Sequence, residues 1–297
     1  MQFTNVAHLP RSLVWAISHG NEYIVEPDAI SVTRLIDSPR IGVLQRQHEQ
    51  ELVADVSDSV YAMLGTAVHR LLAFYPEGMS EKRYYAQFGD VRICGTPDLV
   101  EGETLYDYKV VSTWVNSLGI RVDWERQLNV YRWLLAENGV QINELKLVAV
   151  FRDWTASQVE NGRDGYPSHP AQVYAIPLWT LAEAQGYIDW RVGLHKLAQE
   201  HLPECTPEER WQRDGVWAVY MNNKARAERR AASEAEARDW IVEAGGPWDA
   251  PLVDTPIKKG YSIVKRPDEW RRCERYCNVS RFCKQYQEFI GCDQPAQ

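Results

Sequence analysis

The stretch that decides the fold is residues 94–111, CGTPDLVEGETLYDYKVV. Two apolar segments flank the turn sequence EGE at 101–103, which predicts an antiparallel hairpin. Side chains two residues apart in a strand project from the same face, so Asp107 and Lys109 are expected to share one pocket. Asp98 precedes the hairpin turn, and antiparallel pairing returns it toward Asp107. Two carboxylates can then converge on one divalent cation, and oxygen-rich sites of this kind prefer magnesium or manganese.

Phosphodiester hydrolysis is the chemistry that this combination favours. A divalent ion polarises a phosphoryl oxygen and lowers the pKa of a bound water, while a neighbouring lysine orients or deprotonates the water and offsets negative charge. Taken singly, Asp98 fits a turn aspartate, and Asp107 with Lys109 fits an exposed charge pair on a strand. Their joint occurrence, directly after a Gly-x-x-Asp hairpin sequence at 95–98, favours the site.

Hydrophobic periodicity places the neighbouring elements. Residues 29–48 predict two short helices or one kinked helix, and Asp58 or Ser59 can cap a helix that carries His69 inward. Residues 82–88 and 90–100 are expected to form, with 104–111, a small antiparallel meander.

Further along the chain, Asp123 can cap a long helix over 124–138 that Gly139 ends. Residues 144–154 are almost unbroken in apolar character and predict a central strand. A long mobile loop over 155–170 is expected before a strand at 171–178 and a helix over 181–201.

Four motifs in a fixed order carry a resemblance to a known family. GTAVH at 65–69, CGTPDLV, LYDYKVV and RQLNVYRWLL at 126–135 together resemble the PD-(D/E)XK nucleases, in the branch of the RecB nuclease domain, lambda-type exonucleases and CRISPR-associated exonucleases. The resemblance covers about residues 29–175. It implies an α/β (α+β) fold of the restriction-endonuclease type, with a central mixed sheet flanked by helices. It also implies a deoxyribonuclease that depends on Mg²⁺ or Mn²⁺.

The resemblance assigns roles to residues that match the family's motifs. It implies that His69, Asp98 and Asp107 bind the metal, with the backbone carbonyl of Tyr108 as a further ligand. Asp98, Asp107 and Lys109 are then the catalytic set, in which Lys109 is the catalytic lysine.

Gln127 and Tyr131 match the family's Gln-x-x-x-Tyr helix, which implies contacts with the DNA backbone. This motif favours an exonuclease over an endonuclease of the same superfamily. Proteins of this kind are frequent in phage recombination modules, so DNA recombination or end processing is the expected process, and a single-strand annealing protein is an expected partner. A non-catalytic DNA-binding or assembly protein on a nuclease fold is the alternative.

Four cysteines in the last third of the chain predict a second metal site. The tail sequence RCERYCNVSRFC contains Cys273, Cys277 and Cys283 with C-x3-C-x5-C spacing, which resembles the C-terminal trio of the family's iron-sulfur members. Those members often place the fourth cysteine ahead of the nuclease core, but no cysteine precedes Cys94 here, so Cys205 is the candidate. This spacing favours a [4Fe-4S] cluster over zinc. Cysteines without a ligand, or a metal-sensing or redox regulator, are the alternatives.

Two domains are expected, a nuclease core over 1–202 and an extension over 203–297. In the extension, residues 224–244 predict a helix with little apolar core of its own, and 245–247 predict a turn. The tail also carries a basic patch of residues that can face a DNA backbone: Lys258, Lys259, Lys265, Arg266, Arg271, Arg272, Arg275, Arg281 and Lys284. Trp114, beyond the catalytic strand, is a candidate for stacking on unpaired bases.

Composition sets limits on these functions. The 297 residues carry a formal net charge of −8, which is the wrong sign for coating nucleic acid by bulk attraction but compatible with a local basic groove. No apolar run is long enough to span a membrane, and the first residues lack the pattern of a secretion signal. We therefore expect a soluble, cytoplasmic protein, and the resemblance to the nuclease family implies that it is encoded by a bacterium or a phage.

Overall fold

The computed structural model describes residues 2–19, 26, 28–76, 78–221, 224–244 and 260–292. It divides the chain into two compact units, Met1–Glu204 and Cys205–Gln297, with the division two residues after the expected boundary. Within the described residues, no helix combines the length and the apolar character that crossing a membrane requires. The predicted turn at 245–247, together with Lys258 and Lys259, lies outside the described residues.

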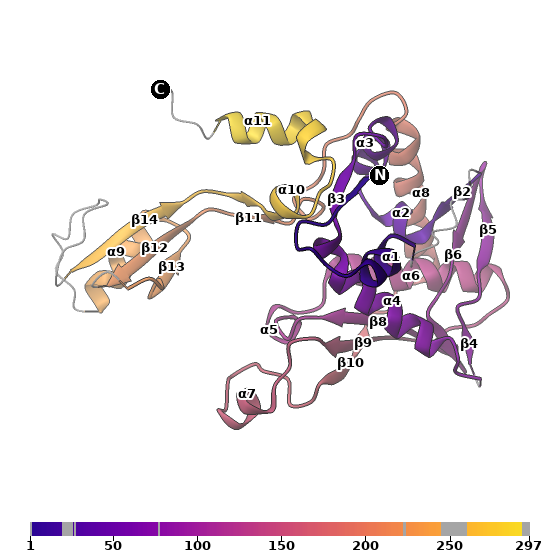
Figure 1. The fold of residues 1–297 in the computed structure, drawn as a ribbon, viewed down its shortest axis with the longest axis horizontal. Helices are drawn as coiled ribbons and strands as arrows, with labels where there is room; N and C mark the ends of the chain where they lie inside the picture. Colours follow the sequence, from indigo (N-terminus) through magenta and orange to yellow (C-terminus); the bar gives the residue numbers. More distant parts are fainter. Residues whose placement is uncertain are drawn as a thin grey trace. The chain divides into compact units, whose positions relative to one another are not determined.

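The first unit is built on a five-stranded mixed sheet in the order β10-β9-β8-β7-β4 (Figure 1). Its members are β4 (Met79–Ser80), β7 (Leu99–Glu101), β8 (Thr104–Val111), β9 (Glu144–Phe151) and β10 (Ala171–Ile176). β8 and β9 pair in parallel, and the other pairs are antiparallel. The expected α/β fold with a mixed sheet is confirmed, as is the hairpin of β7 and β8.

A second sheet shows that the predicted meander is wrong. β5 (Tyr84–Phe88) and β6 (Val91–Gly95) form a hairpin, but they join β2 (Ala29–Ser31) in the separate order β2-β6-β5. Residues 90–100 are therefore two strands in two sheets. Pro97 lies between them and has no N–H to donate to a ladder, which explains the break.

Helices cover these sheets. The main ones are α1 (Arg11–His19), α2 (Val32–Ile36), α3 (Pro39–Gln47), α4 (Val60–Leu72), α6 (Val122–Glu137) and α8 (Leu181–Leu197). The two short helices in residues 29–48 are confirmed, and Pro39 begins the second because its fixed φ suits a first helical position. The prediction that Asp123 caps the long helix is wrong, because α6 begins at Val122 and its N-cap is Arg121. α8 ends at Leu197, short of the predicted His201.

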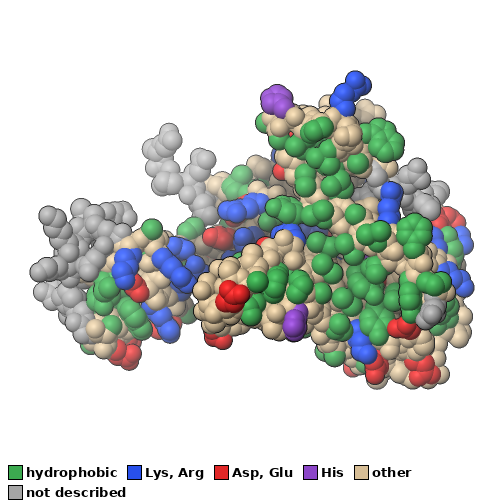
Figure 2. Space-filling view, turned by 60° about the horizontal axis from the view of Figure 1, so that its bottom comes forward, with side chains coloured by type: hydrophobic (Ala, Val, Ile, Leu, Met, Phe, Trp, Pro, Cys, Tyr) green, Lys and Arg blue, Asp and Glu red, His purple; other side chains and the backbone are tan. Residues whose placement is uncertain are grey.

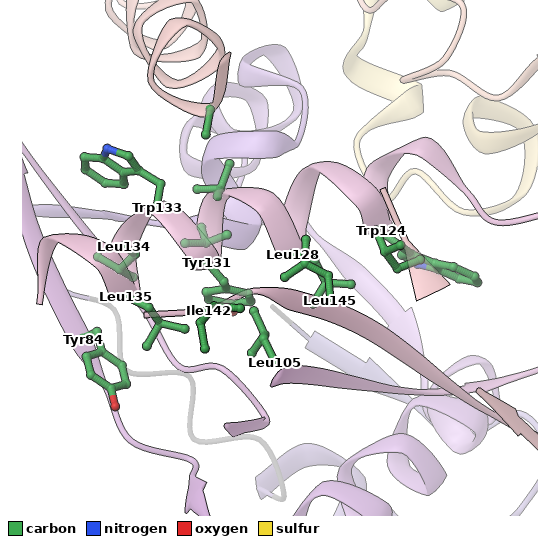
Figure 3. Close-up of a cluster of buried hydrophobic side chains, with 14 of the residues drawn as sticks. Tyr84, Leu105, Trp124, Leu128, Tyr131, Trp133, Leu134, Leu135, Ile142 and Leu145 are labelled. Atoms are coloured by element: carbon green, nitrogen blue, oxygen red, sulfur yellow. The ribbon is translucent and has the colours of Figure 1, made fainter. Parts of the chain in front are cut away.

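The core of the first unit lies between α6 and the parallel strands β8 and β9. Leu128 and Leu135 of α6 are fully buried and face the strands that carry Leu105 and Leu145, as Figure 3 shows. Tyr131 points into the same core and is only 6% exposed. Burial of these large side chains holds α6 against the face of β8 from which Asp107 and Lys109 project.

Residues 155–170 were predicted to form a mobile loop, but they contain α7 (Ala156–Glu160) and a network of hydrogen bonds. The Trp154 indole donates to the Pro167 carbonyl at 2.9 Å, and the Thr155 amide donates to the Tyr166 hydroxyl at 2.8 Å. The segment is therefore not an irregular loop throughout, since it contains a helix and defined hydrogen bonds.

The second unit contains more strand than expected. β12 (Val216–Met221) pairs with β13 (Arg229–Ala231) on one side and β14 (Tyr261–Arg266) on the other, and α9 (Glu234–Glu243) packs on this sheet. The helix predicted over 224–244 is wrong in its first half, because Ser233 caps α9 through a hydrogen bond from the Glu236 amide. The unit also has an apolar cluster of its own, built on Val219, Ala231, Ala237 and Ile241.

Candidate functional site

The register of the β7–β8 hairpin places Asp98 opposite Asp107. Leu99 pairs with Tyr106, so Asp98 stands one position before that pair and at the level of Asp107. Its Oδ2 accepts a hydrogen bond of 2.7 Å from the backbone amide of Tyr108. This bond holds the Asp98 carboxylate over β8, as the sequence pattern suggested.

Lys109 and Asp107 project from β8 toward α6. Nζ of Lys109 donates to Oδ1 of Asp107 at 2.8 Å and to Oε1 of Gln127 at 3.3 Å. Oδ2 of Asp107 is also buried and lies 2.7 Å from the same Nζ. The Lys109 ammonium therefore contacts both oxygens of the buried carboxylate.

α4 and the residue after β4 complete the site. Nδ1 of His69 lies 3.2 Å from Oδ1 of Asp98 and 3.8 Å from Oε1 of Glu81. One ligand atom from each of these three side chains lies within 4.8 Å of the others, a spacing that can hold a metal ion. His69 is thus turned toward the hairpin, as expected.

Glu81 was missed by the sequence analysis. It follows the two-residue strand β4, and its backbone amide donates to the Asp98 carbonyl at 3.3 Å. Its φ of 51° lies in the left-handed region, which is uncommon for a glutamate and costs free energy. The sequence around it, MSEK, carries no periodicity that places a carboxylate here. Only the pairing of β4 with β7 brings it to the site.

Burial and neighbouring charges shift the pKa values of three of these side chains. Burial raises the pKa of Asp107, and the charge of Asp98 acts in the same direction. Burial and the Asp98 charge also raise the pKa of Glu81. The hydrogen bond with Asp98 raises the pKa of His69. Each shift favours the protonated form of its group, and burial is the main cause for both Asp107 and Glu81.

The donor set fits a hard divalent cation. Two carboxylates, Glu81 and Asp98, and the imidazole of His69 converge, with the buried carboxylate of Asp107 opposite Asp98 in the hairpin, and oxygen-rich sites of this type suit Mg²⁺ or Mn²⁺. The amide of Tyr108, whose carbonyl was the expected extra ligand, is the group that fixes Asp98.

The two residues of the Gln-x-x-x-Tyr motif lie in different surroundings. Gln127 reaches the site through its contact with Lys109. Tyr131 packs in the core, where a Cβ added to Gly95 would stand 2.5 Å from its Cε1 atom. Through these two residues, α6 contacts both Lys109 of β8 and Gly95 of β6. The Tyr131 ring packs so close to Gly95 that a larger residue there would collide with it.

In the second unit, the predicted ligand Cys273 is affected by the other three cysteines of the predicted set. Burial raises the pKa of Cys273 to about 12. The sulfurs that add to this rise are those of Cys277, Cys205 and Cys283. Gln285 of α11 (Lys284–Cys292) accepts from the Cys205 amide at 2.9 Å and donates to its carbonyl at 3.1 Å. This buried clamp joins the start of the unit to its tail.

Comparisons with known proteins give structural likenesses alone. No family model and no curated protein matches the sequence. The solved structure of a protein named SSO0001 superposes on 62% of this chain and 84% of its own, with a TM-score of 0.43 and 17% identity. The alkaline exonuclease LHK-Exo from Laribacter hongkongensis superposes on 58% of this chain and 90% of its own, with a TM-score of 0.37 and 10% identity. TM-scores and identities this low carry no argument about function, so we argue function from the geometry of the site.

Proposed function

We propose that this protein is a divalent-metal-dependent deoxyribonuclease that hydrolyses phosphodiester bonds. The observation that carries the proposal is the hairpin register, which sets Asp98 against Asp107 with Lys109 on the same face of β8. His69 and Glu81 place an imidazole and a further carboxylate beside Asp98. This is a ligand set for Mg²⁺ or Mn²⁺ with a lysine beside it.

The residues of the candidate site have different proposed roles. His69, Glu81, Asp98 and Asp107 would hold the ion, which supplies polarisation of the phosphoryl oxygen and a lowered pKa of bound water. Lys109 orients the attacking water and offsets the negative charge that develops on the phosphate. Gln127 accepts from Nζ at 3.3 Å and so keeps the ammonium directed at the site.

An exonuclease is the preferred form of this activity, because Gln127 and Tyr131 stand at the positions of the end-processing motif. With Tyr131 buried, its part is to fix α6, and contact with the DNA backbone falls to Gln127. Phage-type recombination or DNA end processing, with a single-strand annealing protein as partner, is the process we propose.

Digestion of labelled DNA tests the proposal. Full-length protein is incubated with end-labelled linear DNA and with closed circular DNA, single and double stranded, in Mg²⁺ or Mn²⁺. We expect mononucleotides or short oligonucleotides from the linear forms while the circles stay intact. Cleavage of circles indicates an endonuclease. Binding of DNA without cleavage in either metal favours the non-catalytic alternative.

For the second unit, we propose that Cys205, Cys273, Cys277 and Cys283 bind one [4Fe-4S] cluster, with Zn²⁺ as the alternative. The proposal is supported by the effect of the other three sulfurs on the pKa of Cys273 and by the Gln285 clamp on Cys205. A bound metal would join the two ends of this unit, so its binding free energy would also stabilise the fold.

A further inference from the structure

Trp114 is an exposed aromatic side chain on a rigid support. It follows β8, and its side chain is 55% exposed. The segment that carries it is tied to the chain after β9, because Asp153 accepts from the Ser112 hydroxyl at 2.6 Å and from the Thr113 amide at 2.7 Å. Rigid presentation of a large apolar ring to solvent contributes little to folding, but it lowers the entropic cost of binding.

A second set of bonds reinforces the support. Nδ2 of Asn116 and Oγ of Ser117 both donate to the Gly165 carbonyl, at 3.0 and 3.2 Å. The Tyr174 hydroxyl of β10 donates to Oδ1 of Asn116 at 2.9 Å. Three neighbouring segments therefore hold α5 (Val115–Leu118) and the tryptophan before it in place.

Two arginine–aromatic pairs stand at this end of the sheet. The Arg163 guanidinium lies 4.8 Å from the centre of the Trp114 ring, and the Arg152 guanidinium lies 4.6 Å from that of Tyr61. Tyr61 is 60% exposed, and both arginines are exposed. Figure 2 shows many hydrophobic side chains on the face that it views, with Lys and Arg side chains in several places. Each pair offers a π-face for a base and a planar cation for a phosphate.

The elements that carry the candidate site residues also carry or adjoin these pairs. Arg152 donates its amide to the carbonyl of Val111, the last residue of β8, two positions beyond Lys109. On α4, Tyr61 precedes His69 by eight residues, which is about 12 Å along a helix axis. The two pairs therefore stand on, or directly after, elements that also carry candidate site residues, toward the carboxyl ends of the parallel strands β8 and β9.

We propose that Trp114 and Tyr61, with Arg163 and Arg152, form a stacking platform that binds the unpaired bases of a DNA strand entering the site. The proposal rests on the proposed nuclease function and specifies its substrate as single-stranded DNA or a frayed end. Aromatic side chains stack on any base, while arginine contacts phosphate, so the platform binds without sequence preference. It also supplies local positive charge that an acidic chain needs for DNA.

The test is binding in EDTA, where no cleavage occurs. Fluorescence anisotropy of labelled dT15 and of an abasic strand of equal length is measured with the full-length protein and its variants. Wild type is expected to bind dT15 more tightly than the abasic strand. Trp114→Ala is expected to weaken dT15 binding by about 5- to 150-fold and to remove the preference over the abasic strand, whereas Trp114→Phe retains most of both.

Trp190→Ala is the matched control. Trp190 of α8 is 48% exposed and has the Arg191 guanidinium 5.2 Å from its ring, but it stands on a helix that packs on α6 and α2. Its dT15 binding is expected to match wild type. Arg163→Gln should lower the slope of log K against log salt by about one unit, because it removes one phosphate contact.

Three outcomes overturn the platform: equal dT15 binding by Trp114→Ala and wild type, equal loss in Trp190→Ala, or no preference of wild type for dT15 over the abasic strand. The proposed function is judged separately by digestion. If wild type cleaves DNA and Trp114→Ala binds normally, only the platform fails. If the platform variants behave as expected but wild type cleaves nothing in Mg²⁺ or Mn²⁺, only the nuclease assignment fails.

Discussion

Lys109 lies between the buried carboxylate of Asp107 and the amide of Gln127, with its ammonium in contact with both. We expect Lys109→Ala to lower the cleavage rate by at least about 100-fold, because the variant loses the group that orients water and offsets charge. Mn²⁺ binding, measured by isothermal titration calorimetry, should be retained. Lys146→Ala is the control, since Lys146 forms the same strand pair with Glu144 on β9 but lies outside the site. A similar loss in both variants would contradict a specific role for Lys109.

Glu81 gives a second prediction at this scale, because it is the candidate ligand that the sequence did not reveal. Glu81→Gln is expected to weaken Mn²⁺ binding at least about tenfold, since an amide oxygen carries no charge to offset that of the ion. Calorimetric titration measures the change. Glu101→Gln, at the far end of β7, should bind Mn²⁺ as wild type does. Unchanged affinity in Glu81→Gln would remove this residue from the ligand set.

Among elements, the contact of α6 with the β5–β6 hairpin depends on Gly95. An added Cβ would meet Tyr131 at 2.5 Å and Val32 at 2.9 Å, so Gly95→Ala should lower the free energy of unfolding by about 1–3 kcal/mol. Gly65→Ala is the matched control, because Gly65 lies within α4 with nothing near its absent Cβ. It should raise stability by about 0.5–1 kcal/mol, as alanine is the better helix former. Urea unfolding of both variants measures the effects, and equal changes would contradict this packing.

The same elements show how far the sequence could lead. The two-residue period of LYDYKVV and the EGE turn predicted the hairpin, and with it the approach of Asp98 to Asp107, because strand alternation and turn chemistry are local properties. Glu81 and the split of residues 90–100 between two sheets could not be read in this way. They depend on the pairing of β4 with β7 and of β6 with β2, and such pairing between strands that are not consecutive is decided by tertiary packing and not by local sequence. In the second unit, the Ser233 cap was a local signal present in the sequence.

At the scale of the whole molecule, the proposed cysteine site is expected to stabilise the second unit by joining its two ends. Anaerobically purified protein should be brown, with visible absorbance from sulfur-to-iron charge transfer and four cysteines per cluster. Serine at Cys205, Cys273, Cys277 or Cys283 should remove the colour and lower the stability of the protein, because metal binding closes the chain between the two ends of the unit. Cys94→Ser, in β6 of the other unit, should leave the colour unchanged. If the protein is colourless and contains stoichiometric zinc, the site binds zinc and not an iron-sulfur cluster. If it is stable without any metal, both proposals are wrong.

The central claim is that the carboxylates of the β7–β8 hairpin form a metal centre that hydrolyses DNA. Its most direct test compares wild type and Asp107→Asn on end-labelled linear DNA in Mn²⁺, with circular dichroism to verify the fold. Wild type should release labelled nucleotide only when the metal is present. Asp107→Asn should be at least about 1,000-fold slower, because one of the facing carboxylates has lost its charge. Cleavage at the wild-type rate by a folded Asp107→Asn protein, or none by wild type in Mn²⁺ or Mg²⁺, would contradict the claim.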